Sequence, residues 1–124
     1  MNSSPDLARR LRGSLKIPVM AAPIFIASTP ELVVAQCRSG IIGSIPALNA
    51  RTSAELDADL VQIKHDLQGC DVPYAVNLVA HKSNERLEAD LDLTIKHRVP
   101  IVVLALAASS AIVDAIHAYG VVFK

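Results

Sequence analysis

Short runs of apolar residues, rich in valine and isoleucine, alternate with amphipathic stretches along this chain. A short apolar run bounded by turn residues is typical of a buried strand, whereas apolar residues that recur every three or four positions are typical of a helix. The alternation therefore predicts repeated strand and helix units. The expected strands lie near Ile17–Ala22, Ile41–Ile45, Tyr74–Val79, Ile101–Leu106 and Val121–Phe123.

The first two expected helices carry their own start signals. Thr29 is a suitable N-cap, Pro30 follows at the first helical position, and Gly40 can adopt the left-handed conformation after the helix. In the second helix, Thr52 and Glu55 have the spacing of a capping box. The apolar positions of this second helix recur at intervals of four, three and four residues, and they are Leu56, Leu60, Ile63 and Leu67.

Two further helices are expected in the second half of the chain. Ser83 can cap a third helix, which Pro100 prevents from continuing into the next strand. A fourth helix is expected from about Ala111 to Tyr119, and it ends at Gly120. The apolar stripe of the third helix comprises Leu87, Leu91 and Ile95.

The expected strands indicate a parallel sheet. Residues 101–104 are apolar at every position, so both faces of that strand are expected to be covered, as in sheets that pack between helices. This pattern predicts an α/β fold. Strand starts about 20 to 30 residues apart suit an eight-unit barrel of roughly 250 residues, but an open doubly wound sheet has the same local pattern.

Composition narrows the class of protein. The chain has 124 residues, of which 52% are hydrophobic, enough for the core of one domain. Lysine and arginine together number 12, as do aspartate and glutamate, so no bulk charge favours nucleic acid or an anionic membrane as a partner. The apolar runs are well short of the ~20 residues that a membrane span requires.

The termini and cysteines suggest a cytoplasmic protein. Arg9, Arg10 and Arg12 lie near the N-terminus, but no long apolar segment with a cleavage site follows them, as a secretory signal would require. Cys37 and Cys70 form no CxxC pair, so both are expected to be reduced packing residues. His65, His97 and His117 have no metal-ligand spacing, and no metal site is expected.

Several segments, in order, resemble the opening of the nitronate monooxygenases, also called the 2-nitropropane dioxygenase-like family. A first strand ending in Ala-Pro-Ile, a Ser-Thr-Pro-Glu-Leu helix start and a glycine-bounded second strand occupy residues 18–24, 28–32 and 40–44. An asparagine-bearing third strand and a His-Lys-Ser-Asn sequence occupy residues 74–78 and 81–84. The resemblance covers nearly the whole chain.

The resemblance implies the N-terminal half of a (β/α)8 TIM-type barrel, with residues 1–124 forming about four βα units and a fifth strand. It also implies one non-covalent FMN, which the family uses to oxidise alkyl nitronates with O2 to a carbonyl compound and nitrite. The flavin supplies the redox chemistry, and the protein positions it. As an expected half barrel, the chain by itself is expected to be inactive.

The resemblance also assigns residues to the flavin. Ala22, Pro23 and Ile24 would lie against the isoalloxazine, and Asn77 would hydrogen-bond the ring; Ile24 replaces the family's usual methionine. The family's catalytic histidine lies in a glycine-rich motif after a later strand and is not found in these 124 residues. His81 is a weak catalytic candidate in its place.

The residues themselves support these assignments unequally. Asparagine is depleted in strands and a buried amide must find a partner, so Asn77 in an apolar strand is the strongest candidate ligand. His81 shares the parity of Asn77 and follows the same strand, although the sequence slightly favours a solvated loop histidine, because no nearby residue gives a triad-like spacing. Weaker candidates, in loops after the second and third strands, are Ser44, Asn49 and Lys82.

Two alternatives to the monooxygenase stay open. One is a related flavin barrel, such as the NAD(P)H-dependent enoyl-acyl-carrier-protein reductase of type II, and the other is a non-catalytic α/β binding module. Motifs for dinucleotide, NTP, acyl-transfer and zinc chemistry are absent from the sequence. Because residues 121–123 would leave an apolar edge uncovered, the chain is expected to be a half barrel that self-associates.

Overall fold

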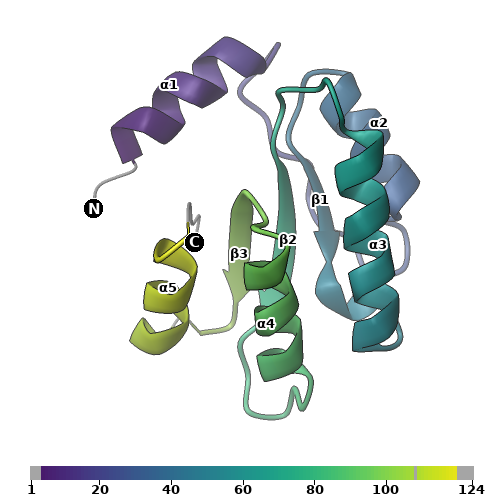
Figure 1. The fold of residues 1–124 in the computed structure, drawn as a ribbon, viewed down its shortest axis with the longest axis vertical. Coiled ribbons are helices and arrows are strands. Elements are labelled where there is room, and N and C mark those ends of the chain that lie inside the picture. Colours follow the sequence, from purple (N-terminus) through teal and green to yellow (C-terminus); the bar gives the residue numbers. More distant parts are fainter. Residues whose placement is uncertain (1–3, 108, 120–124) are drawn as a thin grey trace.

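Three parallel strands form one sheet, with helices packed around it (Figure 1). The computed structural model describes residues 4–107 and 109–119. The strands are β1 (Gly43–Pro46), β2 (Tyr74–Val79) and β3 (Ile101–Ala105). The helices are α1 (Ser4–Ser14), α2 (Pro30–Arg38), α3 (Ser53–Asp66), α4 (Leu87–Lys96) and α5 (Ser110–His117), and a short 3-10 helix, η1 (Ala47–Asn49), follows β1.

The connections follow the order of a βα repeat. The sheet order is β1-β2-β3, with Pro46 opposite Asn77 and Asn77 opposite Val103. A helix connects each strand to the next, α3 between β1 and β2 and α4 between β2 and β3. The α2, α3, α4 and α5 helices contact one another in chain order, and α2 and α4 pack on the sheet (Figure 1). The predicted α/β class with a parallel sheet is confirmed.

The two faces of the sheet have different partners. Side chains that point toward α2, α3 and α4, such as Val76 and Leu78, belong to the main apolar core. Those on the opposite, inner face form a smaller cluster with Leu11 and Leu15 at the end of α1. The inner cluster contains Ile42, Ala75 and Ile101. Alternation along each strand therefore separates a helix-covered face from an inner face.

The predicted helix signals at Thr29, Gly40 and Thr52 are confirmed. The Thr29 hydroxyl accepts a hydrogen bond from the backbone N–H of Leu32 at 3.1 Å, and the Thr52 hydroxyl accepts one from Glu55 at 3.1 Å. Gly40 has a φ of 99°, a conformation that side chains disfavour. The reciprocal half of the capping box differs, because the Glu55 carboxylate accepts from the N–H of Arg51 and not from that of Thr52.

The prediction that Ser83 caps the third helix is wrong. The α4 helix begins at Leu87, and the Asn84 side chain accepts a hydrogen bond from the N–H of Arg86 at 3.1 Å. Ser83 instead contacts Nδ1 of His81. Asparagine readily forms such local turns, which delay the start of a helix.

The first predicted strand is reduced to one parallel bridge, between Met20 and Ile42. Pro18 lacks an N–H donor, so pairing does not extend along the whole of Ile17–Ala22. The α1 helix precedes it and was not predicted. The fifth predicted strand, at 121–123, lies outside the described residues. No described helix is long and apolar enough to cross a membrane.

Both cysteines are free, as predicted from their spacing. Cys37 lies on the buried face of α2, and its burial raises the pKa of the thiol to about 11. Tyr119 is half-buried and donates its hydroxyl to the carbonyl of Val99 at 3.1 Å. Burial raises the pKa of the Tyr119 phenol as well. These side chains therefore serve packing in the described structure.

An ion pair joins α3 to the end of α4. Nε2 of His97 lies 2.5 Å from Oδ1 of Asp57, and Nζ of Lys96 lies 3.2 Å from the same oxygen. His97 is buried and Asp57 is partly exposed. The hydrogen bonds from His97 and then from Lys96 lower the pKa of Asp57.

This lowered pKa predicts a pH dependence of stability. A carboxyl whose pKa is lower in the folded state stabilises the fold fully above its unfolded pKa of about 4, and the contribution disappears as pH falls through the folded-state pKa. We expect Asp57→Asn to unfold at lower urea concentration than the unsubstituted chain at pH 6, with the gap closing below about pH 4. A gap that is the same at pH 6 and pH 3 would contradict an ionic role for Asp57.

Candidate functional site

The carboxyl ends of the strands bring three side chains of the inner face into one row. Asn77 on β2 lies between Pro46 on β1 and Val103 on β3, because these residues are register partners. Ligand sites in parallel α/β folds form at this end of the sheet, where the loops that follow the strands converge. The row therefore marks the part of the fold where a ligand is expected.

Asn77 is the polar member of the row, and its side-chain oxygen has no donor among the described residues. Its Oδ1 is buried and accepts no hydrogen bond from any residue that the structure describes. A buried oxygen without a donor costs on the order of 1–3 kcal/mol, so native structures rarely leave one unexplained. The position fits a ligand that presents an N–H or O–H to the inner face of β2.

The segment with Ala22, Pro23 and Ile24 follows the bridge to β1. Ala21 donates its N–H to the carbonyl of Ile42 at 2.8 Å, and the carbonyl of Ala21 accepts the hydroxyl of Ser44. These contacts hold Ala21 beside the start of β1, and the parallel direction of the chain takes residues 22–24 toward the carboxyl end of β1. Ser44, a weaker candidate ligand from the sequence, is buried and uses its hydroxyl in this contact.

The three predicted flavin contacts differ in exposure. Ala22 is exposed, Pro23 is half-buried, and Ile24 has 55% of its side chain exposed. Pro23 cannot donate to a neighbouring strand, so the chain leaves the sheet here and turns. An exposed isoleucine at this end of the sheet offers an apolar surface to a ligand.

Asn49 serves the loop that follows. Its Oδ1 accepts from the N–H of Ile26 at 3.0 Å, and its Nδ2 donates to the carbonyls of Ile24 at 3.2 Å and Ser28 at 2.8 Å. The sequence suggested a weak ligand role for Asn49. The structure gives this amide three partners within the protein instead.

His81 and Lys82 lie past the end of β2, and both are exposed. Nδ1 of His81 accepts the N–H of Ser83 at 3.1 Å and lies 2.7 Å from its hydroxyl. In the described part of the chain, no hydrogen bond connects either side chain to Asn77. The structure thus places His81 at the predicted end of the strand, within a local turn.

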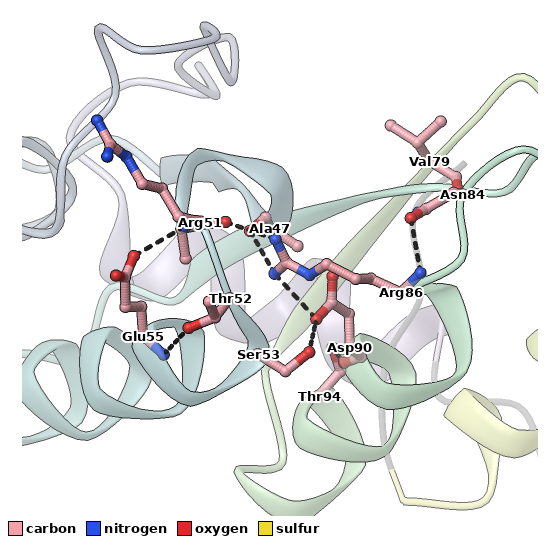
Figure 2. A network of polar contacts seen from close by, with 11 residues as sticks. Ala47, Arg51, Thr52, Ser53, Glu55, Val79, Asn84, Arg86, Asp90 and Thr94 are labelled. Atoms are coloured by element: carbon pink, nitrogen blue, oxygen red, sulfur yellow. Dashed lines mark hydrogen bonds and ion pairs between the residues drawn. The ribbon is translucent and has the colours of Figure 1, made fainter.

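An arginine–aspartate pair behind these loops was missed in the sequence (Figure 2). Nη1 of Arg86 donates to the carbonyl of Ala50 at 2.6 Å, and its Nη2 lies 3.1 Å from Oδ1 of Asp90. Asp90 is buried and also accepts the hydroxyl of Ser53 at 3.0 Å. The signal available in the sequence was the spacing of Arg86 and Asp90, four residues apart at a helix start.

Comparison with known proteins finds similarity in structure and none in sequence. No protein-family model matches the chain, and no curated protein matches it. FabK from Thermotoga maritima, solved both unsubstituted and as a point mutant, matches with a TM-score of 0.76 and 19% identity over 94% of this chain. Nitroalkane oxidase from Streptomyces ansochromogenes matches with a TM-score of 0.75 and 15% identity over 90% of this chain.

These matches establish the fold. The chain spans 37% and 35% of the two FabK chains and 41% of the nitroalkane oxidase chain. It therefore has the fold of part of a TIM-type barrel, with parallel strands and an outer layer of helices, as the sequence predicted.

Proposed function

We propose that this chain is the N-terminal part of an FMN-dependent oxidoreductase barrel. The observation that carries the proposal is the buried Oδ1 of Asn77, which has no donor among the described residues at the carboxyl end of the sheet. The isoalloxazine ring of FMN is flat, largely apolar and bears a ring N–H, so it can donate to this oxygen. The apolar neighbours in the row, Pro46 and Val103, suit the rest of such a ring.

In this proposal the residues of the chain bind and orient the flavin. Asn77 accepts the ring N–H and fixes the orientation of the ring in its plane. Pro23 directs the chain away from the sheet, and Ile24 covers the ring and excludes water from it. Bound at these residues, FMN would supply the redox chemistry that links oxidation of the substrate to reduction of O2. The isoleucine side chain is stiffer than that of the methionine usual in the family at position 24. We therefore expect Ile24 to adapt its shape to a ligand less than methionine would.

We propose an alkyl nitronate as the substrate, with O2 as co-substrate. A nitronate is the deprotonated form of a nitroalkane, so the match to a nitroalkane oxidase favours this chemical class. The match to FabK favours the second candidate, an NAD(P)H-dependent enoyl-acyl-carrier-protein reductase of type II. A closed barrel containing this chain should consume O2 with an alkyl nitronate. NAD(P)H-dependent reduction of an enoyl thioester in its place would favour the second candidate.

Flavin binding can be tested on the 124-residue chain itself by two-dimensional NMR. The chain spans less than half the length of the barrel proteins that it matches, so we expect weak binding that requires FMN at high concentration. The Asn77 side-chain amide and the backbone amide of Ile24 should shift together as FMN is added. Asn77→Ala should weaken binding by about 1–3 kcal/mol, the usual effect of removing one hydrogen-bonding partner of a buried group.

His81→Ala is the matched control, because His81 follows the same strand but is exposed. It should leave the FMN dissociation constant within error of the unsubstituted value. Equal affinity of the Asn77→Ala and unsubstituted chains would contradict the proposal, as would shifts confined to residues remote from the carboxyl ends of the strands.

A further inference from the structure

The loop between Pro23 and α2 exposes three large apolar side chains in succession. Ile24, Phe25 and Ile26 are exposed to 55%, 68% and 76% respectively. Ile26 also has a φ of 67°, in the left-handed region that β-branched residues rarely adopt. Backbone strain of this kind persists only where the surrounding structure imposes it, and it concentrates at ligand sites.

The side chain of Asn49 imposes this loop conformation. Its amide makes all three hydrogen bonds to one short stretch, accepting from Ile26 and donating to the carbonyls of Ile24 and Ser28. The hydroxyl of Ser28, which is buried, accepts the N–H of Ile24 at 2.8 Å and closes the loop from inside. Asparagine suits this task because it combines one acceptor and two donors on a short side chain.

Arg86 in turn holds the turn on which Asn49 lies. From the start of α4, its guanidinium donates to the carbonyls of Ala50, at 2.6 Å, and Ala47, at 3.5 Å, on either side of Asn49 (Figure 2). Asp90 orients the guanidinium through Nη2. A continuous path of hydrogen bonds therefore runs from α4 through η1 to the loop that contains Ile24.

We propose that Asn49 is a positioning residue of the ligand site, and that Arg86 fixes its placement. Asn49 holds Ile24 outward beside the carboxyl end of β1 before any ligand arrives, which reduces the entropy that binding would otherwise cost. The part of the inference that concerns the ligand rests on the proposed function, because the ligand there is FMN. The part that concerns the loop rests on the hydrogen bonds alone.

Amide hydrogen exchange tests the loop. In Asn49→Ala, exchange of the Ile26 amide should become about tenfold faster, as expected for the loss of one hydrogen bond of typical strength. Asn49→Asp keeps the acceptor for Ile26 and should restore part of that protection. Arg86→Lys retains a charge for Asp90 but loses the two-pronged contact with the carbonyls, so it should also speed exchange at Ile26. The amide of Val76, in the core of β2, reports global stability, so the effect at Ile26 is judged against any change at Val76 in the same variant.

Titration with FMN tests the part of the inference that concerns the ligand. Asn49→Ala should raise the FMN dissociation constant several-fold while Asn77 is intact, and Asn49→Asp should lie between it and the unsubstituted chain. Unchanged exchange at Ile26 in Asn49→Ala would overturn the positioning role, and so would a mobile loop with unchanged FMN affinity. Failure of the unsubstituted chain to bind FMN would instead count against the proposed function, and the exchange result would still decide whether Asn49 sets the loop.

Discussion

Replacing Asp90 with alanine is expected to lower the free energy of unfolding by about 3 kcal/mol. The Asp90 carboxylate is 1% exposed and accepts hydrogen bonds from Arg86 and Ser53. Its removal would leave the Arg86 guanidinium partly buried without a counter-charge and the Ser53 hydroxyl without its acceptor. Because 24% of the Arg86 side chain remains exposed, water offsets some of this cost, and the low end of the usual range applies.

Urea unfolding followed by circular dichroism measures this effect. Asp92→Ala is the matched control, since Asp92 is an exposed aspartate on the same helix, and its loss should change stability by less than about 0.5 kcal/mol. Asp90→Asn should fall between the two, because it keeps an acceptor but loses the charge. If Asp90→Ala and Asp92→Ala unfolded at the same urea concentration, the buried pair would contribute no net stability.

The sequence predicted best those elements whose signals are local. The limits of β2 were predicted as Tyr74–Val79, as observed, because an apolar run between a proline-containing turn and a polar loop leaves little choice of ends. The caps at Thr29 and Thr52 were found for the same reason, since a cap depends on residues within one turn of the helix.

The errors arise where two local signals compete or where pairing needs a neighbour. Ser83 and Asn84 can both begin a helix, and the sequence offered no way to see that the Asn84 amide would engage Arg86 and defer the helix to Leu87. The apolar run at 17–22 has the composition of a strand. Whether such a run forms one depends on strands beside it, which composition does not report.

The residues of the candidate site also differ in how far the sequence could identify them. Asn77 was identifiable from the sequence because an amide in an apolar strand is anomalous by itself, whereas its proposed role in binding FMN stays a prediction. The roles of Asn49 and Arg86 were not identifiable. The hydrogen bonds from Asn49 to the loop and from Arg86 to the backbone around Asn49 join residues 21 to 39 positions apart, and no periodic pattern in one sequence specifies which carbonyl a distant side chain reaches.

Gly43→Ala is the second substitution expected to have a large effect, lowering the free energy of unfolding by up to about 3 kcal/mol. A Cβ at Gly43 would lie 2.5 Å from the backbone oxygen of Val33 and 3.1 Å from Sγ of Cys37. The Val33 oxygen belongs to α2, which packs on β1, so it cannot rotate away as a side chain could. The helix must therefore move off the strand, and the buried side chains between them lose contact.

Gly13→Ala is the control for this substitution. Gly13 lies in α1 with nothing within 4 Å of the position of a Cβ, so alanine there should be neutral or stabilise the helix by up to about 1 kcal/mol. A second variant separates the two close contacts of Gly43. Adding Cys37→Ala to Gly43→Ala removes the sulfur but leaves the Val33 oxygen in place. Once the effect of Cys37→Ala alone is subtracted, we expect the double variant to regain little stability in urea unfolding. Substantial recovery would mean that the sulfur, and not the helix backbone, limits how closely α2 approaches β1.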